Sequence, residues 1–308
     1  MATSSLTKKG LLAAADKVII GARPALELVS QFTTDFSAEA VKPGTGVAVD
    51  VLKAGTATFV KGTNDYGTGN TGTVKNITVT TDIRKISSFM LDDLDALEDE
   101  TSHLWDKFGP AAGRAIGADL VKSVTGKLTR TNRADAYTLA GSPALGDFFK
   151  IRGYIEGKGI DPSTCVLLLE PTTYSLLCSL LNAGIVGDGS VVRAGIIGQA
   201  LGFKSVFSGP TISTDGAAAS DGKGKGFVVP ENALAVVNRV VKPIKGVAGG
   251  LLEYGVSTDE VSGVSISQRV VYDAKAGECW WSAEGLFGSK LTLADSNGAP
   301  GYYQIVVS

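Results

Sequence analysis

The chain has 308 residues, of which 44% are hydrophobic and 19% charged, and its formal net charge is −2. This balance argues against a protein whose main task is to grip nucleic acid, because such proteins usually carry a basic face. The 39 glycines follow no period and the apolar content is high, which excludes a fibrous or disordered chain. The length allows two domains.

The sequence also indicates a soluble, non-secreted protein. The apolar run after Lys8 and Lys9 is too short for a signal peptide, and no stretch approaches the length of a membrane span. Three cysteines, Cys165, Cys178 and Cys279, form no C-x-x-C pair. Such a sparse, odd set indicates reduced and buried thiols made in a cytoplasm.

Residues 1 to about 40 show no regular apolar pattern, apart from a short helical run at Ala25–Phe32 that follows Pro24. We therefore expect an N-terminal arm that lies along another surface. Residues 41–86 predict a long β-hairpin, because apolar and polar residues alternate along both arms and a glycine-rich stretch lies between them. A lone ribbon is marginal in water, so its own domain or a neighbouring subunit should support it.

The stretch Phe89–Thr129 predicts one long amphipathic helix. Apolar residues recur every three or four positions from Met90 to Ala115, and acidic residues precede basic ones, as the helix dipole favours. We expect Pro110 to bend this helix rather than end it. At 1.5 Å per residue it would reach roughly 60 Å, which indicates an elongated subunit.

Residues of about 130–242 predict a mixed α/β region, and the chain then returns to β-structure. Helices are expected at 143–156 and from Glu170 onward, and Gly209–Gly226 is an expected loop. Strands are expected at Cys165–Leu169, Lys204–Phe207, Phe227–Val229, Ala233–Val241, Leu251–Val256, Val264–Asp273, Glu278–Phe287 and Tyr302–Val307. In the expected strand Glu278–Phe287, the adjacent residues Trp280 and Trp281 should point to opposite faces, so that one of them enters the core.

Three patterns hint at chemistry, and each has a simpler structural explanation. Gly67–Gly72 matches G-x-G-x-x-G, but a strand pattern follows it where the dinucleotide fingerprint needs a helix. Gly126-Lys127 lacks the remaining positions of a phosphate-binding loop. The single histidine, His103, lies beside the helical apolar stripe, without a nucleophile elbow or a zinc ligand set. We therefore predict no catalytic, cofactor-binding or metal-binding residues.

Two stretches resemble the major capsid proteins of tailed bacteriophages, whose fold is shared with encapsulins. Val264–Gly288, VSISQRVVYDAKAGECWWSAEGLFG, is similar to their closing strands, and Leu201–Ser208, LGFKSVFS, is similar to a strand entry of their axial domains. The order of the parts is similar as well. The resemblance implies an α+β fold with an N-terminal arm at 1–40, an extended β-hairpin loop at 41–86, a peripheral domain with a long spine helix and a sheet at 87–129 and 243–308, and an inserted axial α/β domain at 130–242.

The resemblance further implies a structural protein rather than an enzyme, whose copies form the pentamers and hexamers of an icosahedral shell around a double-stranded DNA genome. Implied partners are a separate scaffolding protein, a portal, decoration proteins and packaged DNA held without sequence-specific contacts. No membrane partner is implied. The place of action would be the virion, assembled in the cytoplasm of a host bacterium.

Contacts between subunits are expected from the hairpin, the acidic start of the long helix and the axial loops. The acidic run Asp92–Glu100 could instead be a solvated helix face. The candidate contact residues are Val47, Val49, Phe59, Asp65, Tyr66, Ile77, Val79, Asp92, Asp93, Lys223 and Lys225. Three alternatives remain at this point: an encapsulin-like compartment for a protein cargo, a soluble α/β enzyme with a glycine-rich nucleotide site, and a β-rich surface protein.

Overall fold

The computed structural model of the chain contains helices, strands and two main sheets. The structure describes residues 8–52, 74–92, 102–129, 133–184, 201–208, 224–241, 251–273, 275–292 and 301–307. The chain divides into two compact units. The first unit comprises Met1–Val47, Val79–Thr125 and Val236–Ser289, and the second comprises Ala48–Thr78, Gly126–Ala235 and Lys290–Ser308.

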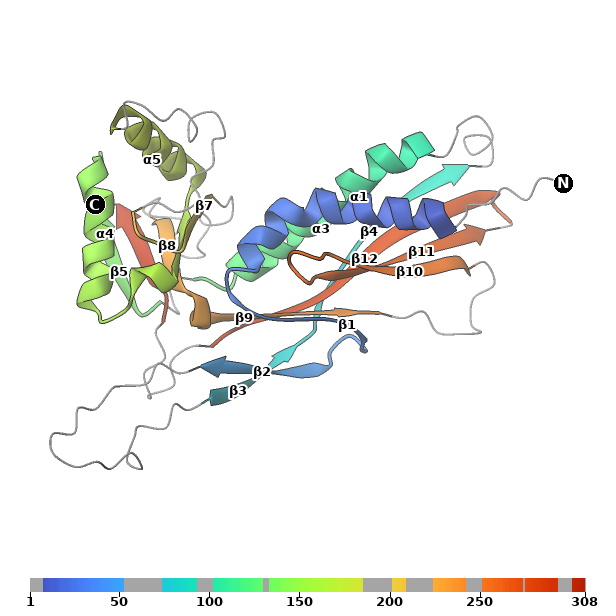
Figure 1. The fold of residues 1–308 in the computed structure, drawn as a ribbon, viewed down its shortest axis with the longest axis horizontal. Helices are drawn as coiled ribbons and strands as arrows, with labels where there is room; N and C mark the ends of the chain where they lie inside the picture. Colours follow the sequence, from blue (N-terminus) through green and yellow to red (C-terminus); the bar gives the residue numbers. More distant parts are fainter. Residues whose placement is uncertain are drawn as a thin grey trace. The chain divides into compact units, whose positions relative to one another are not determined.

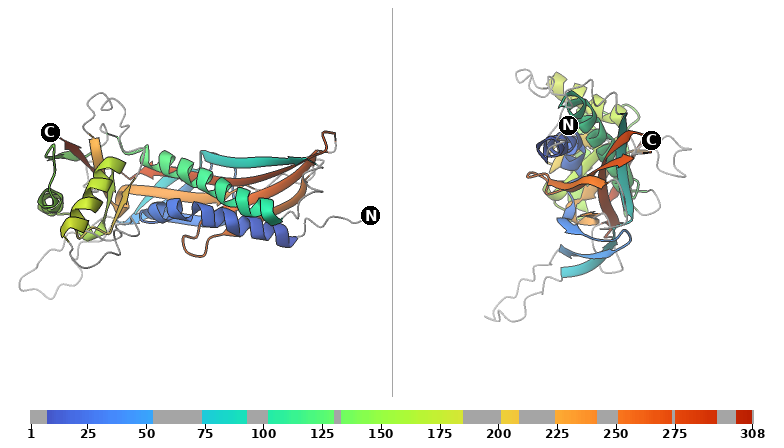
Figure 2. Two further views of the ribbon diagram at one scale, coloured as in Figure 1. Left: turned by 90° about the horizontal axis from the view of Figure 1, so that it is seen from above. Right: turned by 90° about the vertical axis from the view of Figure 1, so that its right-hand side faces the viewer.

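In the first unit, helices α1 (Lys8–Val29) and α3 (Ser102–Thr125) lie side by side and run in the same direction (Figures 1 and 2). They cover one face of a six-stranded sheet in the order β1-β9-β12-β11-β10, with β4 also paired to β12. Its strands are β1 (Thr33–Ala40), β4 (Ile83–Asp92), β9 (Leu234–Val240), β10 (Leu251–Thr258), β11 (Ser265–Asp273) and β12 (Glu278–Leu291).

In the expected N-terminal arm at residues 1–40, the structure shows α1 and β1, so the helix begins at Lys8 rather than at Ala25. The buried side chains Val18, Ala22, Leu26 and Val29 repeat at helical spacing and form one face of α1. The helix continues through Pro24. It packs against α3 at glycines of the partner helix: a Cβ atom on Gly113 would overlap the carbonyl oxygen of Val18. The N-terminal segment is therefore part of the core of its own unit.

The predicted helix at Phe89–Thr129 is confirmed over Ser102–Thr125 and wrong at Phe89–Asp92, while residues 93–101 lie outside the described part of the chain. Phe89 lies in strand β4, where it is the ladder partner of Trp281 in β12, and its ring stacks on Phe108 of α3 at 4.5 Å between centroids. This packing fixes an extended backbone although the apolar spacing also fits a helix. Helix α3 then runs from Ser102 to Thr125, and Pro110 lies inside it without ending it, as predicted.

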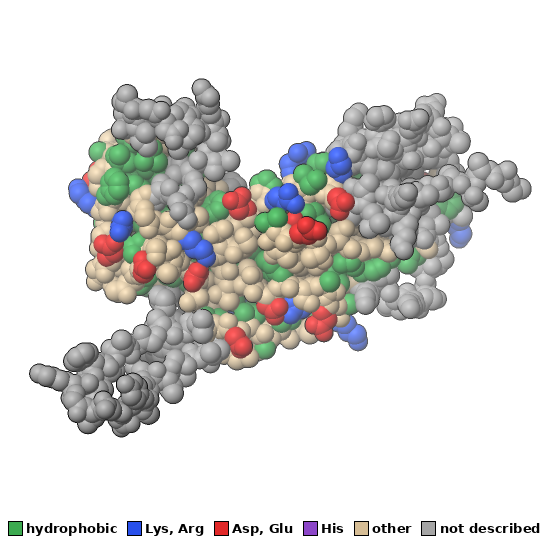
Figure 3. Space-filling view, in the orientation of Figure 1, with side chains coloured by type: hydrophobic (Ala, Val, Ile, Leu, Met, Phe, Trp, Pro, Cys, Tyr) green, Lys and Arg blue, Asp and Glu red, His purple; other side chains and the backbone are tan. Residues whose placement is uncertain are grey.

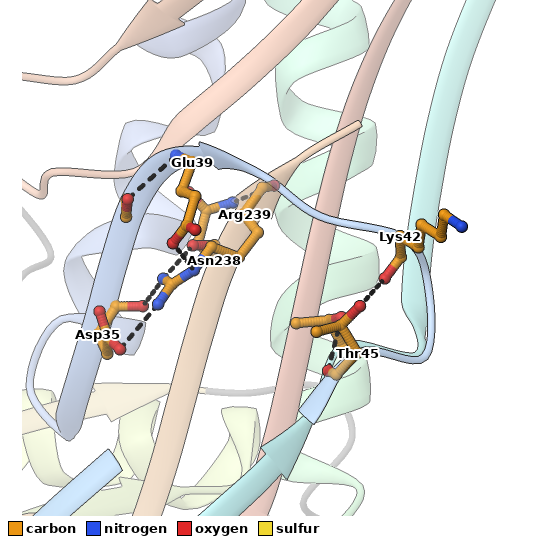
Figure 4. A network of polar contacts seen from close by, with 8 residues as sticks. Asp35, Glu39, Lys42, Thr45, Asn238 and Arg239 are labelled. Atoms are coloured by element: carbon orange, nitrogen blue, oxygen red, sulfur yellow. Dashed lines mark hydrogen bonds and ion pairs between the residues drawn. The ribbon is translucent and has the colours of Figure 1, made fainter. Parts of the chain in front are cut away.

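A polar network joins β1 to the neighbouring strand β9 (Figure 4). The buried guanidinium of Arg239 donates to the carboxylate of Asp35 at 2.8 Å and to its backbone carbonyl at 2.9 Å. Asn238 accepts a hydrogen bond from the backbone of Ser265 at 2.7 Å and donates to the carbonyls of Ser265 and Leu286. The network satisfies buried polar groups where β9 meets two further strands.

The second unit contains a five-stranded sheet in the order β5-β13-β8-β6-β7, with helices α4 (Leu145–Gly157) and α5 (Pro171–Gly184). Side chains of α4 and α5, among them Phe148, Ile151 and Leu177, pack into one buried cluster with the strands. The strands are β5 (Asp135–Leu139), β6 (Cys165–Leu169), β7 (Ser205–Ser208), β8 (Gly224–Pro230) and β13 (Tyr303–Val307), and short 3₁₀ turns cover Pro162–Thr164 and Glu231–Ala233.

The predicted helices and strands after residue 140 are confirmed within a few residues. Two of these strands, however, belong to a different sheet from the one expected. Strand β13 pairs with β5 and β8 in the second unit, although residues 243–308 were expected to share one sheet. Strand β9 belongs to the sheet of the first unit, although it was expected in the axial region. For both strands, the choice of sheet depends on pairing with strands that are distant in the sequence, and the local sequence does not indicate that pairing.

The predicted hairpin is described only near its base. Strands β2 (Gly46–Leu52) and β3 (Val74–Thr80) form a two-stranded sheet, with the Asn76 side chain donating to Asp50 at 3.1 Å. The expected return strand does not continue through Ile83, because β3 ends at Thr80 and β4 begins at Ile83. The expected tip, including Gly67–Gly72, lies outside the described residues.

Candidate interaction surfaces

The described residues assemble no constellation typical of an enzyme site. No group of three or more His, Cys, Asp or Glu residues in the described ranges could hold a metal ion. Gly126-Lys127 follows helix α3, whereas a phosphate-binding loop follows a strand. Burial raises the pKa of the Cys165 thiol to about 12, so this group is an inert core thiol. Cys178 is half-buried, and the side chains of Cys279 and His103 lie outside the described set.

A cavity of about 190 Å³ lies beside the start of α5, lined by Leu139, Pro143, Thr173 and Lys225 among others. A helix start and a lysine could attract an anion. However, the Lys225 amine donates to the carboxylate of Glu170 at 2.9 Å, which neutralises its charge. The cavity therefore offers no free cation. Within the described part of the chain, no helix has the length and apolar character of a membrane span.

An apolar row crosses four strands on the sheet face opposite the helices. Met90 of β4 is the ladder partner of Trp280 in β12, which pairs with Val271 in β11, which in turn pairs with Leu251 in β10. Met90, Trp280 and Leu251 are 45%, 41% and 36% exposed, and Val271 is half-buried. Their neighbours Phe89 and Trp281 point to the helix side, where Trp281 is buried. Contiguous exposed apolar side chains of this kind mark interaction surfaces.

A charge cluster lies on the same face, beyond this apolar row. The carboxylate of Glu284 is 1% exposed and forms ion pairs with Arg84 of β4 and Arg269 of β11. The hydrogen bond between the Arg84 guanidinium and the Glu284 carboxylate is the main reason that the pKa of Arg84 is raised. Two guanidinium groups thus compensate one buried carboxylate and tie three adjacent strands together. The row and the cluster make this face partly apolar and partly charged.

Several residues expected at subunit contacts are buried within the chain itself. Val49, Ile77 and Val79 are at most 8% exposed in this conformation, where they support the hairpin base. The chain's own residues cover the alternating faces of β2 and β3, and a role of these three residues at a subunit contact stays a prediction. Val47 is half-buried, and Lys225 is engaged by Glu170. Thus the base of the hairpin is anchored internally.

The remaining candidates are placed less fully. Asp92 ends strand β4, where its ladder partner is Glu278, so the predicted acidic helix start begins in a strand. Phe59, Asp65, Tyr66, Asp93 and Lys223 lie outside the described residues. The prediction that one of the two adjacent tryptophans enters the core is confirmed, because Trp281 is buried and Trp280 exposed.

Sequence reasoning missed the exposed apolar residues of β4. Ile86 and Met90 are 51% and 45% exposed on one face of this strand. The apolar residues of this strand lie at positions 83, 86 and 89–91, which is not a period of two, so the sequence carried no clear strand signal there. On the face shown in Figure 3, acidic and basic side chains are interspersed with apolar ones, as the balanced net charge leads one to expect.

Comparison with solved structures shows which fold these surfaces belong to. The chain is similar to the capsid of cyanophage P-SCSP1u, with 13% identity, a TM-score of 0.51 and coverage of 91% of this chain and 88% of that chain. It is also similar to a virus-like particle from Pyrococcus furiosus, with 11% identity, a TM-score of 0.53 and coverage of 95% and 97%. A chain of Microbacterium phage Oxtober96 matches at 10% identity and a TM-score of 0.50, covering 91% and 90%.

No protein-family model and no curated protein sequence matches the chain. At these low identities the structural similarity concerns the fold, and it extends over nearly the whole length of each protein compared. The resemblance inferred from the sequence is therefore confirmed for the fold. This chain has the α+β fold found in phage capsids and in a virus-like particle.

Proposed function

We propose that the chain is a structural capsid subunit, many copies of which assemble into an icosahedral shell around a phage's double-stranded DNA. The observation that carries this proposal is the fold, which matches a cyanophage capsid over 91% of the chain. A fold alone does not determine a function. The exposed apolar row Met90–Trp280–Val271–Leu251 adds a physical reason to associate, because burial of this row would remove apolar surface from water.

The parts of the chain are assigned to the parts of a capsid subunit as follows. The first unit is the peripheral domain, with α3 as its spine helix, and the α/β part within 130–242 is the axial domain. Residues 41–86 form the extended loop that reaches a neighbouring subunit. The internally anchored hairpin base supports this assignment, because buried Val49, Ile77 and Val79 hold the base in its own chain and leave residues beyond it for a neighbour.

Assembly requires only weak individual contacts. Each subunit of a shell touches several neighbours, so small contact energies combine through multivalency. The subunits would form pentamers and hexamers, with a scaffolding protein, a portal and decoration proteins as further partners. The net charge of −2 fits a container that holds DNA without sequence-specific contacts. The finished particle is the virion, assembled in the host cytoplasm.

A second candidate is a protein compartment that encloses a cargo other than a genome. The similarity to the Pyrococcus furiosus virus-like particle favours it, since that match has a TM-score of 0.53 and covers 95% of the chain. Both candidates share the shell and differ in its contents. Neither requires catalysis by the subunit.

Negative-stain electron microscopy of the purified full chain tests the shared claim. The proposal predicts closed particles hundreds of ångströms wide. A discrete monomer or small oligomer under all assembly conditions would contradict it. Absorbance spectra and gel analysis of particles isolated from the native source then separate the candidates: double-stranded DNA supports the virion, and a copurifying enzyme without a genome supports the compartment.

A further inference from the structure

Strand β4 forms an edge of the six-stranded sheet in the first unit. It pairs with β12 along its whole length, from Ile83 opposite Phe287 to Asp92 opposite Glu278. Among the described residues, no strand pairs with its other edge (Figure 2). An edge strand leaves a row of backbone donors and acceptors that can pair with another chain, and natural proteins usually block such edges with proline, bulges or outward lysines. Residues 83–92 contain no proline and no bulge in their ladder, and their one lysine, Lys85, pairs with Asp119 of α3 on the helix side.

Alternate residues of this edge strand carry opposite charges at the two ends of the series and apolar residues between them. From Arg84 onward, alternate positions are a cation, an apolar residue, a serine, an apolar residue and an anion: Arg84, Ile86, Ser88, Met90 and Asp92. The first four are exposed, with Ile86 at 51% and Met90 at 45%. Such a series is complementary to itself in antiparallel order.

We propose that β4 pairs antiparallel with β4 of a second copy of this chain, with Ser88 on the two-fold axis. In this register Arg84 stands opposite Asp92 of the second copy, and Ile86 stands opposite Met90. Direct cross-strand pairs of opposite charge or of apolar residues stabilise an antiparallel ladder by about 0.2–1 kcal/mol each. The contact is isologous, so each favourable pair occurs twice.

The neighbouring strand strengthens the complementarity. Trp280, which is 41% exposed, lies beside Met90 on β12, so the side chains of Trp280 and Met90 and of Ile86 from the second copy would form one apolar cluster on each side of the axis. Glu278 is the ladder partner of Asp92, so it adds an acidic residue at the end of the strand that would meet Arg84 of the other copy. The side chain of Arg84 remains 43% exposed although it also pairs with Glu284.

The register is limited by the faces of the sheet. A shift of one residue would set the outward face of one β4 against the helix-covered face of the other, because side chains alternate with a period of two. A shift that keeps the faces aligned but moves Ser88 off the axis separates Arg84 from Asp92. The two-fold register is therefore the one that satisfies both the charge pairs and the apolar pairs.

In the proposed shell this pairing would join two subunits across a local two-fold axis, and in that sense it rests on the proposed function. The pairing itself needs only two copies. A result against shells and a result against the β4 contact can therefore be told apart in one experiment on the full chain.

Cysteine cross-linking at the axis tests the register. Directly opposed residues of an antiparallel pair have Cα atoms about 4.5–5.5 Å apart, which a disulfide can span. Ser88→Cys should form a disulfide-linked dimer on mild oxidation. The matched control is Ser282→Cys, the ladder partner of Ser88 one strand further from the axis. Its two copies would lie three strand spacings apart, roughly 14 Å, beyond the reach of a disulfide.

We expect at least roughly tenfold more cross-linked dimer with Ser88→Cys than with Ser282→Cys or the parent chain. Adding Ile86→Lys to Ser88→Cys should abolish the cross-link, because a lysine on an edge strand opposes pairing. The control Val261→Lys changes a residue that is 79% exposed in a turn of the same unit, and it should leave the cross-link unchanged.

Shells without a Ser88→Cys dimer would overturn the β4 pairing and leave the proposed function standing. A Ser88→Cys dimer without any shell would support the pairing and count against the proposed function. Equal cross-linking by Ser88→Cys and Ser282→Cys, or cross-linking that survives Ile86→Lys, would also contradict the pairing.

Discussion

Gly113 of α3 lies against the backbone of Val18 in α1, so closely that a Cβ atom on Gly113 would overlap the Val18 carbonyl oxygen. The same holds for Gly21 of α1 against the backbone of Pro110, whereas a Cβ atom on Gly117 would meet the Cβ atom of Ala25 at 2.8 Å. Glycines at 109, 113 and 117 are four residues apart, which is one helical face. This row of small residues brings the two helices together and makes α1 part of the core.

Gly113→Ala should therefore destabilise the protein. The added methyl group meets backbone atoms, which cannot rotate away, so the helices must separate, at a cost of about 1–3 kcal/mol typical of overpacking. Denaturant unfolding followed by circular dichroism measures the change. Gly153→Ala in α4 is the control, because open space surrounds Gly153 and alanine is the better helix former by roughly 0.5–1 kcal/mol. Equal stability of Gly113→Ala and the parent would contradict this account of the helix pair.

Glu284→Gln should also destabilise the first unit. The change removes the charge that holds Arg84 and Arg269, and hydrogen bonds to charged groups contribute about 1.5–3 kcal/mol each. Because both arginines are partly exposed and can regain water, we expect a total loss of about 1–3 kcal/mol. The midpoint of urea unfolding reports it. Glu156→Gln breaks the exposed pair with Arg152 and should cost less than about 0.5 kcal/mol. A similar loss in both variants would refute the role assigned to Glu284.

Gln268→Met should raise stability. Neither the nitrogen nor the oxygen of the buried Gln268 amide has a hydrogen-bond partner among the described residues. An unsatisfied buried polar group costs about 1–3 kcal/mol, and methionine fills a similar volume without one. The same substitution at Gln304 should lower stability, because buried Gln304 accepts a hydrogen bond from Arg133. Thermal unfolding should show opposite shifts, and shifts of the same sign would show that Gln268 is satisfied.

Stability should fall in alkali partly through Cys165. Burial raises the pKa of this thiol from 9.0 to about 12 in the folded chain. Between these values the unfolded chain binds fewer protons than the folded one, so stability decreases as the pH rises through this window and is unaffected by this group below it. Comparing the parent with Cys165→Ala at pH 8 and pH 10.5 isolates the effect, at most about 2 kcal/mol. An identical pH dependence in the two proteins would contradict it.

The sequence predicts the elements whose apolar pattern has one clear period. Cys165–Leu169, Leu145–Gly157 and the strands after residue 224 occur close to their expected places. The end of strand β4, from Phe89 to Asp92, was predicted as a helix because Met90 fits two periods, whereas the pairing with Trp281, almost 200 residues later, makes it a strand. Helix α1 was missed although Val18, Ala22, Leu26 and Val29 lie at helical spacing, because Gly21 and Pro24 interrupt the run. Both outcomes depend on contacts that are distant in sequence.

The candidate surface shows the same limit. Alternation in the hairpin correctly indicates half-buried strands, but it does not show whether the chain's own residues or a neighbour covers them. The structure shows Val49, Ile77 and Val79 covered within the chain, and it leaves Ile86, Met90 and Trp280 exposed instead. Exposure depends on which face of the sheet the helices cover, and this follows only from the assembled order β1-β9-β12-β11-β10 with β4 on β12.

Sedimentation velocity of the full chain tests the central claim, self-assembly into a closed shell, most directly. The 31.7 kDa subunit sediments slowly alone, whereas a closed shell of many copies sediments as one sharp boundary at least roughly tenfold faster. We predict this fast boundary in the parent chain and its marked reduction in Ile86→Lys. A single slow species of one or two subunits under every condition of salt, pH and concentration tested would contradict the account.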